Sequence, residues 1–492
     1  MKKSLLIAFV TAIILLGLSG TASAETLNWE RVATTGLNLS SNQVIYAQES
    51  FGGYLYVTTM NFSTGADAGG EIWRTADGVN WVCVVGGNAP ALPNPGRGFG
   101  RGTDNGGITS LCVYDGNLYA GTMNSGVADV GAEIWRSPDG LNWTCVVGTD
   151  AVQPKGFNSV TNYGVFAMAV FNGQLYAGTL NSGFFVSGTE IWRTADGTTW
   201  NNVVGGGVPV PPNPGSGFGS WFNSDTLRLT VFNGQLYAST WNGLVGGGGT
   251  EIWRTADGTT WTCVVGTAVP VPPNPGRGFG NPKNMGVFAL CGYGSSLYAG
   301  TINADDGAEI WRSADGATWE RVMSGGFGSV TKSGAIFSMT VFGPHLYAGG
   351  APVRIVEDVE LTALGSEALN LLGAAGYEQL AVRAMTGGTI GTGAGAGVWR
   401  SASGDSWSQV NFDGFGNDKN VMIASLVTFG NRLYSGTGND EGAEIWRTDG
   451  SLYVLPYTGE DKPAGSIGRL ALLLAAVVIG AGALRRATRF SP

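Results

Sequence analysis

A motif of three parts recurs along this chain and restricts its fold more than any other feature. A Leu-Tyr pair begins at Leu55, Leu118, Leu175, Leu236, Leu297, Leu346 and Leu433. A Trp-Arg pair follows each of them, beginning at Trp73, Trp135, Trp192, Trp253, Trp311, Trp399 and Trp446. Each repeat of about 60 residues also holds four strand-like runs, which is typical of a propeller blade. The sequence therefore predicts an all-β fold, a seven-bladed β-propeller of four-stranded antiparallel blades.

A further tryptophan indicates how the ring closes. It follows six of the Trp-Arg pairs, at Trp81, Trp143, Trp200, Trp261, Trp319 and Trp407. The seventh copy, Trp29, lies at the other end of the chain. We therefore expect residues 27–33 to form the outermost strand of the last blade. Such closure lets every blade bury both faces against its neighbours.

An Asp-Gly turn links the third and fourth strands of most blades. If Asp77-Gly78 is a two-residue hairpin loop, Arg74 lies opposite Trp81. The guanidinium would then stack on the indole as a cation–π pair. The Asp77 side chain is expected to accept hydrogen bonds from the backbone of its own turn.

These turns resemble a known repeat. Residues 137–143 read Ser-Pro-Asp-Gly-Leu-Asn-Trp, which is similar to the Asp-box repeat of sialidase-type propellers, although one residue between Asp and Gly is missing. The matching aspartates are Asp77, Asp139, Asp196, Asp257 and Asp315. The resemblance implies a propeller in which these residues are structural, and it raises a carbohydrate-active hydrolase or lyase as one alternative function.

The N-terminus and one insertion fall outside the repeat pattern. Residues 1–24 have a charged start, an apolar run and a small-residue cleavage site, which together indicate a secretory signal peptide. The propeller is predicted to span residues 25–450. Blade six carries an insertion at about residues 351–396, with a helix expected around residues 366–384.

The C-terminus carries an anchoring signal. Residues 451–464 form a short linker that contains the run Leu455, Pro456, Tyr457, Thr458 and Gly459, and residues 465–492 form a hydrophobic segment with a basic tail. This order resembles the sorting signal of sortase substrates. The resemblance implies that a sortase-like transpeptidase cuts between Thr458 and Gly459 and joins the protein to the cell envelope. The alternative is a plain membrane span. Either predicts an exported protein held at the cell surface.

Charge and cysteine placement argue against a nucleic-acid-binding protein and against a disulfide-bonded one. The net charge is −9 and the repeats hold no basic run, so we expect no nucleic-acid partner. Cys83, Cys145 and Cys263 share one repeat position, whereas Cys112 and Cys291 share another at the opposite edge of a blade. That separation is too large for a disulfide, and we expect five free thiols.

Variation among the repeats is concentrated on one rim of the ring. With strands A to D counted outward from the axis, the B–C and D–A loops share this rim, and the D–A loops carry a Gly-Phe pair at Phe99, Phe157, Phe218, Phe279, Phe327 and Phe415. Two tryptophans outside the repeat positions, Trp221 and Trp241, fall on it, as do Phe222, Phe184 and Phe185. Exposed aromatic side chains suit stacking on sugars or anchoring a protein. The alternative is that they form local core.

Catalytic groups are sparse. A sialidase-like hydrolase needs acidic residues and arginines at the mouth of the ring, but only Arg228 interrupts the apolar innermost strands. The candidate acids Asp104 and Asp225 belong to different blades, and His345 is the sole histidine, which excludes a His-based triad on the variable rim and any multi-histidine metal site. We therefore assign no catalytic residue.

One loop has the spacing of a calcium site. Asn303, Asp305 and Glu309 place oxygen atoms at alternate positions. The alternative is a polar turn whose glutamate belongs to the repeat. No other cofactor is expected.

Together these features predict an exported, surface-anchored and non-catalytic propeller that binds an extracellular glycan or protein. The alternatives are a sialidase-like hydrolase or lyase, and a purely structural envelope protein.

Overall fold

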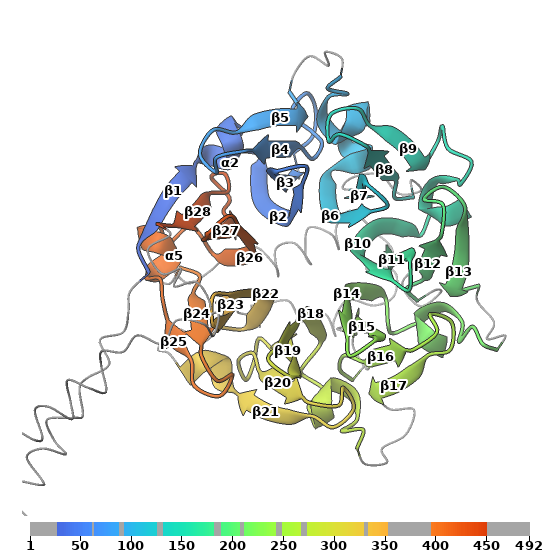
Figure 1. Cartoon of the computed structure of the whole chain (residues 1–492), viewed down its shortest axis with the longest axis vertical. Coiled ribbons are helices and arrows are strands. Elements are labelled where there is room, and N and C mark those ends of the chain that lie inside the picture. The colour runs from blue at the N-terminus through green and yellow to red at the C-terminus, as the bar shows by residue number, and fades with distance from the viewer. Residues whose placement is uncertain are drawn as a thin grey trace, which may run out of the picture. The chain divides into compact units, whose positions relative to one another are not determined.

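The strands form a closed ring of seven blades around a central axis (Figure 1). The computed structural model describes residues 27–61, 63–87, 93–124, 131–181, 188–206, 211–242, 248–266, 273–328, 333–352 and 395–449. Within these ranges each blade is a four-stranded antiparallel sheet. The all-β propeller prediction is confirmed.

The blades follow one another in chain order. Blade one holds β2 (Asn42–Phe51), β3 (Tyr54–Asn61), β4 (Ile72–Thr75) and β5 (Val82–Val85). Blade two holds β6 (Gly107–Tyr114), β7 (Asn117–Met123), β8 (Ile134–Ser137) and β9 (Thr144–Val147). Blade three holds β10 (Asn162–Phe171), β11 (Gln174–Asn181), β12 (Ile191–Thr194) and β13 (Trp200–Val204). Blade four holds β14 (Asp225–Phe232), β15 (Gln235–Trp241), β16 (Ile252–Thr255) and β17 (Thr262–Val265).

The remaining blades repeat this plan. Blade five holds β18 (Gly286–Tyr293), β19 (Ser296–Ile302), β20 (Ile310–Ser313) and β21 (Glu320–Met323). Blade six holds β22 (Ala335–Phe342), β23 (His345–Ala351), β24 (Val398–Ser401) and the shorter β25 (Ser408–Gln409). Blade seven holds β26 (Met422–Phe429), β27 (Arg432–Gly438), β28 (Ile445–Thr448) and β1 (Trp29–Ala33). The labelled helices α2 (Thr35–Asn38) and α5 (Asp413–Gly416) are single turns.

The ring closes between the two ends of the propeller. Strand β1 pairs with β28 so that Trp29 faces Thr448 and Arg31 faces Trp446. In Figure 1 the blue β1 accordingly lies beside the red β28. The N-terminal strand completes blade seven, as the position of Trp29 in the sequence predicts.

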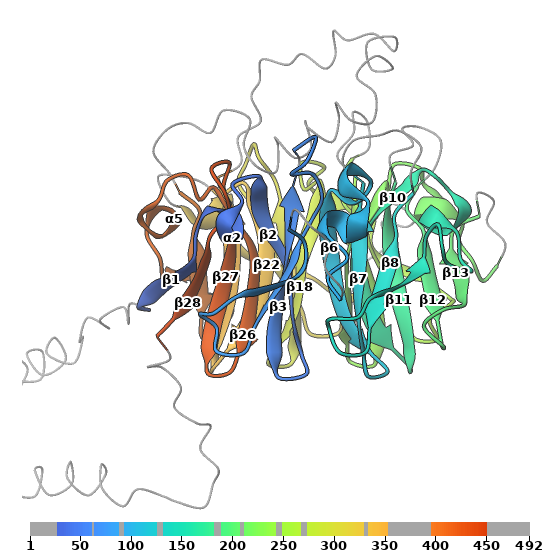
Figure 2. The ribbon, with the colours of Figure 1, turned by 90° about the horizontal axis from the view of Figure 1, so that it is seen from above.

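The two rims differ as expected from the strand order. Figure 2 shows short hairpin turns along one rim and the longer connections along the other. The first are the A–B and C–D turns, and we call this side the plain rim. The second are the B–C and D–A connections, and we call this side the variable rim.

The predicted pairing across the C–D turn is wrong. Arg74 pairs with Val82 instead of Trp81, because the turn is wider than two residues. Its guanidinium lies over the ring of Tyr54, with Cζ 4.2 Å from the ring centroid. Arg74 therefore packs on an aromatic ring of β3 and not on the tryptophan of its own hairpin.

Asp77 explains the width of this turn. Its Oδ1 atom accepts hydrogen bonds from the backbone nitrogens of Val79 (2.9 Å) and Asn80 (2.8 Å) and from Oγ1 of Thr75 (3.0 Å). These bonds favour the ionised carboxylate, and the Asn80 amide and then the Val79 amide lower the pKa of Asp77. The prediction that Asp77 accepts hydrogen bonds from the backbone of its own turn is confirmed.

A tyrosine of the preceding blade packs against each of these turns. The hydroxyl of Tyr56 in blade one lies against Gly140 in blade two and leaves no room for a Cβ atom there. The same contact joins Tyr119 to Gly197 and Tyr298 to Gly404. Arg74 Nη1 donates to the Tyr56 hydroxyl at 3.1 Å. The Leu-Tyr, Trp-Arg and Asp-Gly elements of the repeat therefore meet at the blade junctions.

All five cysteines are free thiols. Burial, and then the charge of Glu71, raise the pKa of Cys83 to about 12. Burial raises the pKa of Cys291 to about 11. These are packed side chains with little thiolate character.

Several predicted segments lie outside the described residues. They are the signal peptide at 1–24, the helix around 366–384 within the blade-six insertion, the sorting motif in 451–464 and the anchor at 465–492. Among the residues that are described, no helix is both long and apolar enough to cross a membrane.

Candidate functional site

A glutamate carboxylate that is buried in five blades and partly buried in blade three joins the strands and loops at the variable-rim side. It lies two residues before the Trp-Arg tryptophan and belongs to Glu71, Glu133, Glu190, Glu251, Glu309 and Glu444. In blade one, Glu71 Oε2 accepts from Asn42 Nδ2 (2.8 Å) and Trp73 Nε1 (2.9 Å). Glu71 Oε1 accepts from Arg97 Nε at 3.1 Å. The bonds from asparagine and tryptophan recur in all six blades, so this network is structural.

The Gly-Phe pairs join one blade to the next. Phe99 stacks on Trp135 of blade two, with ring centroids 4.5 Å apart and planes 3° apart, and meets Trp143 edge-on at 5.4 Å. The same pair of contacts recurs at Phe157, Phe218, Phe279, Phe327 and Phe415. These phenylalanines are therefore part of the scaffold, although the sequence places them on the variable rim.

Blade six lacks the carboxylate network. Gly397 stands where the other blades have glutamate, and Ser333 stands where they have the asparagine partner. The indole of Trp399 lies across Gly397, which leaves no room there for a Cβ atom. Phe327 still stacks on Trp399 at 4.1 Å and meets Trp407 edge-on at 5.7 Å. This junction therefore keeps the stacking of phenylalanine on tryptophan but lacks the glutamate carboxylate.

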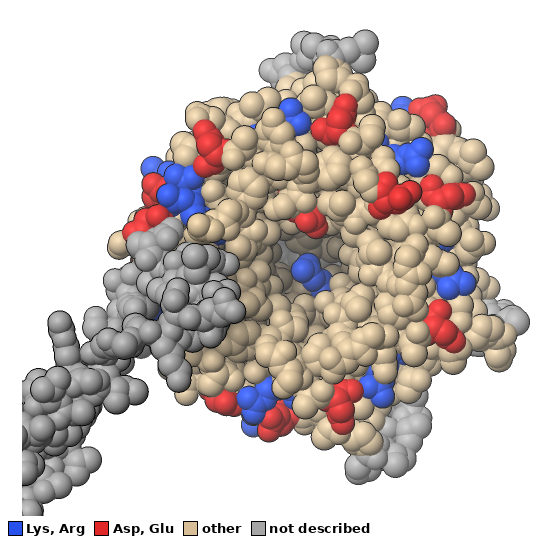
Figure 3. Space-filling view, viewed as in Figure 1, with Lys and Arg blue, Asp and Glu red and all other residues tan. Residues whose placement is uncertain are grey.

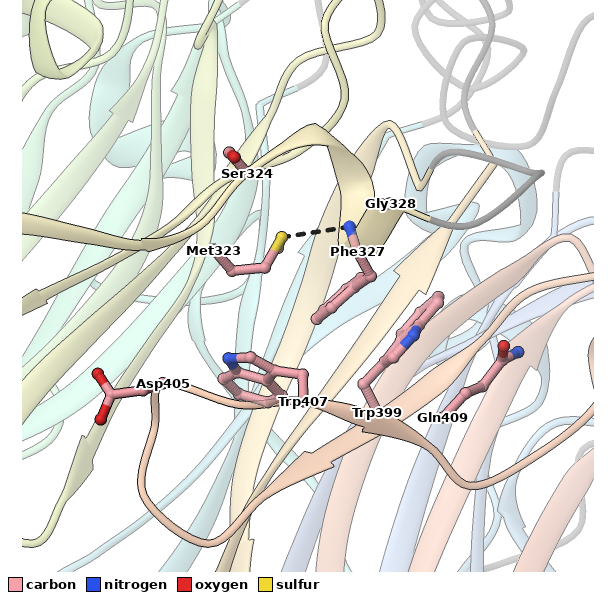
Figure 4. Close-up of a pocket in the computed structure, with 8 residues that line it drawn as sticks. All are labelled: Met323, Ser324, Phe327, Gly328, Trp399, Asp405, Trp407 and Gln409. Atoms are coloured by element: carbon pink, nitrogen blue, oxygen red, sulfur yellow. Dashed lines mark hydrogen bonds between the residues drawn. The ribbon is translucent and has the colours of Figure 1, made fainter. Parts of the chain in front are cut away.

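An open pocket of about 450 Å³ lies at this junction (Figure 4). It is lined by Met323, Ser324, Phe327, Gly328, Trp399, Asp405, Trp407 and Gln409. The connection before it is short, running from Met323 to Phe327, whereas the equivalent connection after blade one runs from Val85 to Phe99. The longer loop carries Arg97, which pairs with Glu71, whereas in blade five Arg321 of the outermost strand pairs with Glu309.

The pocket combines aromatic walls with polar groups at its edge. Trp407 and Phe327 are half-buried, and Asp405 and Gln409 are exposed. Asp405 Oδ1 forms an ion pair with Arg312 Nη1 at 2.9 Å. Sequence reasoning missed this pocket. The signal that could have found it is the joint replacement of glutamate and asparagine in a single repeat.

The predicted rim aromatics divide into two groups. Trp221 and Phe222 stack with their ring centroids 3.7 Å apart, and Trp221 is 37% exposed. Trp241 ends β15, packs against the apolar cluster on the ring axis and meets Phe288 edge-on at 6.2 Å. Phe184 and Phe185 lie outside the described residues. The structure thus brings Trp221 and Phe222 together on the variable rim and places Trp241 against the core.

The axis of the ring is mostly apolar. The innermost strands carry charge only at Glu49, Asp225 and Arg228. Figure 3 shows a hollow at the centre of the ring in which acidic and basic groups are visible. Burial raises the pKa of Asp225 to about 7, opposed by a hydrogen bond from the Asn181 amide. Burial also raises the pKa of Glu49, opposed by the Ser50 amide and the charge of Arg228.

The second acid named from the sequence lies elsewhere. Asp104 sits in the connection before β6, and its Oδ2 atom accepts from Lys155 Nζ at 3.4 Å. Asp225 opens the innermost strand of blade four. The two carboxylates therefore belong to separate environments.

The residues of the calcium candidate have protein partners. Glu309 Oε2 accepts from Asn284 Nδ2 at 2.7 Å and from Trp311 Nε1 at 2.9 Å. Asn303 Nδ2 donates to Asn284 at 3.0 Å, and Asp305 pairs with Lys283 at 3.4 Å. Within the described ranges, no group of three or more His, Cys, Asp or Glu side chains is placed to hold a metal. Glu309 belongs to the repeated network, and calcium binding stays a prediction.

Comparison with known proteins gives no family. No protein-family model matches the chain, and no curated protein matches it. Among solved structures that do match is a Trypanosoma rangeli sialidase in complex with 2,3-difluorosialic acid, described as a covalent intermediate. It is 14% identical, with a TM-score of 0.37 over 69% of this chain and 53% of the sialidase. This chain thus spans about half the length of that protein, and the fold rests on the strand pairing described above.

Proposed function

We propose that this protein is an exported, surface-anchored and non-catalytic propeller that binds a glycan through its variable rim. The observation that carries the proposal is the stacked pair of Trp221 and Phe222, whose outer ring remains exposed on that rim. A flat aromatic surface of this kind fits the apolar face of a sugar ring. Anchoring a protein partner is the alternative use of the same surface.

The position of the pair supports this use. Trp221 and Phe222 lie in the D–A connection between β13 and β14, and their rings stack on each other, whereas the Gly-Phe phenylalanines pack against tryptophans of the next blade. They occur in a single repeat, so the sevenfold architecture does not require them. Aromatic side chains on a rigid scaffold, outside its repeated core, are the usual basis of a binding surface.

Export and anchoring are part of the proposal. They rest on the signal peptide at residues 1–24 and on the sorting motif from Leu455 to Gly459, which precedes an apolar segment and a basic tail. We propose a sortase-like transpeptidase as the enzyme that processes the Thr458–Gly459 bond. A variant with Thr458→Ala should then remain uncleaved when cell fractions are compared by mass.

A hydrolase or lyase is the second candidate. The observation that favours it is the presence of Glu49, Asp225 and Arg228 on innermost strands that are otherwise apolar. Carboxylates with raised pKa values can serve as general acids in glycoside hydrolysis. Release of sugar from a glycan, lost in Asp225→Asn or Glu49→Gln, would support this candidate and overturn the non-catalytic proposal.

The direct test is a glycan-binding screen of the purified protein and its Trp221→Ala variant. We expect affinity for the bound glycan to fall about 10-fold or more, because truncating an aromatic anchor commonly costs about 2 kcal/mol. Val79→Ala is the matched control, since Val79 is 46% exposed but lies in a turn of the plain rim. Equal binding by Trp221→Ala and the parent protein would exclude this surface as the glycan site.

A further inference from the structure

The junction between blades five and six differs from the others in the residues beside its Trp-Arg tryptophan. Among the described residues, a basic side chain pairs with the carboxylate in five of the six blades that keep it. Arg97 on Glu71 and Arg277 on Glu251 are two examples, at 3.1 and 2.8 Å. Blade six has Gly397 in place of that carboxylate. Its outermost strand β25 has two residues, whereas β5 has four. An open pocket walled by aromatic rings lies at this junction.

We propose that this pocket binds one neutral pyranose ring, as a binding site separate from the Trp221 surface on the rim. Its volume of about 450 Å³ lies within the usual range of small-ligand sites. Figure 4 shows Trp399, Trp407 and Phe327 on its walls with Asp405 and Gln409 beside them. A pyranose ring has an apolar face that stacks on such rings and an edge of hydroxyl groups that needs polar partners.

The polar groups decide between a sugar and an apolar ligand. Asp405 and Gln409 are exposed, and an apolar ligand would strip water from them without replacing its hydrogen bonds. Hydroxyl groups can donate to the Asp405 carboxylate and both donate to and accept from the Gln409 amide. The edge of the pocket therefore selects a hydroxylated ring.

Charge decides between a neutral and an acidic sugar. The Asp405 carboxylate is paired with Arg312, whose guanidinium also contacts Glu320. This arginine is thus shared by two carboxylates, and the described residues that line the pocket include no Lys or Arg. A ligand carboxylate would be repelled by Asp405, so a neutral ring is preferred.

The test uses the full chain with 5-fluorotryptophan at its 16 tryptophan positions. D-glucose, D-galactose, D-mannose and N-acetyl-D-glucosamine are titrated separately, in the millimolar range, and followed by ¹⁹F NMR. We expect one of these sugars to shift the signals of Trp399 and Trp407, while those of Trp311 and Trp319, their counterparts in blade five, stay fixed. Single tryptophan-to-phenylalanine variants assign these four signals and that of Trp221.

Two exposed lining residues supply the variants. Gln409→Ala and Asp405→Asn should each weaken binding about 5-fold, because the first removes a hydrogen-bond partner of a ligand hydroxyl and the second replaces a charged acceptor by a neutral amide. Ser408→Ala is the matched control, since Ser408 neighbours Gln409 on β25 and is exposed but does not line the pocket. It should bind as the parent protein does.

The outcomes separate this site from the rim. No shift of Trp399 and Trp407 with any of the four sugars overturns the pocket proposal, as does a shift that persists unchanged in both Gln409→Ala and Asp405→Asn. A shift confined to Trp221 leaves the proposed rim function standing and overturns the pocket. A shift confined to Trp399 and Trp407 supports the pocket, whatever the rim surface does.

Discussion

Blade one and blade six share a strand order and differ in what fills the space beside their Trp-Arg tryptophan. In blade one, Glu71 collects hydrogen bonds from Asn42, Trp73 and Arg97 and is almost fully buried. In blade six, the indole of Trp399 lies over Gly397, and an open pocket lies beside that tryptophan. The comparison distinguishes the contacts that both blades keep from the carboxylate network, which blade six lacks.

Blade six remains joined to its neighbour because other contacts persist. The Tyr298 hydroxyl lies against Gly404, and the Tyr293 hydroxyl lies 2.7 Å from the carbonyl oxygen of Ala402. Phe327 still stacks on Trp399. Tyrosine contacts at the plain rim and aromatic stacking near the variable rim are thus sufficient for a blade. The carboxylate network is therefore an added element, which blade six lacks.

The largest expected effect is from Glu71→Ala in blade one. This substitution leaves Arg97, Asn42 and Trp73 without the acceptor that they share. Removing one partner of a buried ion pair costs about 3–5 kcal/mol of stability. Urea unfolding followed by tryptophan fluorescence measures the loss. Gln409→Ala in blade six is the contrasting variant and should change the free energy of unfolding by less than about 0.5 kcal/mol. Similar losses in both variants would break the comparison.

A smaller effect is expected for the glycines beneath the tyrosines. Gly140 and Gly404 have φ of 70° and 84° and no room for a Cβ atom. Alanine there adds left-handed strain of about 1–2 kcal/mol and overpacking of about 1–3 kcal/mol. Gly140→Ala and Gly404→Ala should destabilise the protein equally, since this contact is common to both junctions.

Gly173→Ala is the control for this pair. Gly173 has φ of 71° with open space around it, so that only the strain of about 1–2 kcal/mol applies. Chemical denaturation of the three variants side by side measures the difference. If Gly404→Ala behaved like Gly173→Ala, blade six would not depend on the tyrosine contact.

The last comparison is kinetic, not a change in stability, and concerns thiols at one repeat position. Cys83 in blade one occupies the register of Gln409 in blade six, opposite Trp73 and Trp399 respectively. Burial and Glu71 raise the pKa of Cys83 to about 12, whereas an exposed thiol has a pKa of about 8.5. At pH 8 the thiol introduced by Gln409→Cys should react with Ellman's reagent about 10³-fold faster than Cys83. Equal rates in the native protein would show that the two positions are equally covered.

Repetition made most of the architecture predictable. The spacing of the Leu-Tyr and Trp-Arg pairs gives the seven blades, and Trp29 gives the closing strand, because each repeat reports the same local structure. The hairpin width was not predictable from Asp77-Gly78 alone. The Asp77 side chain accepts hydrogen bonds from the backbone nitrogens of Val79 and Asn80, which widens the turn. Val82 instead of Trp81 then lies opposite Arg74.

The candidate site was only partly predictable. Trp221 and Trp241 look alike in the sequence, as tryptophans outside the repeat pattern. In the structure Trp221 stacks on Phe222 at the rim, whereas Trp241 packs on the axis against Phe288, a residue of the next blade. The sequence does not distinguish them, because burial of a side chain depends on neighbours from other repeats.

By itself, the sequence determined the number of blades, the order of their strands and the residue that closes the ring. These properties follow from short-range periodicity, in which strands and turns a few residues apart pair with one another. Only the tertiary structure decided which aromatic residues are exposed and where the ring has space to hold a ligand. Trp399 and Trp407 come from one hairpin of blade six, whereas Phe327 comes from the connection that follows blade five, and the pocket exists because packing between these two blades leaves it open.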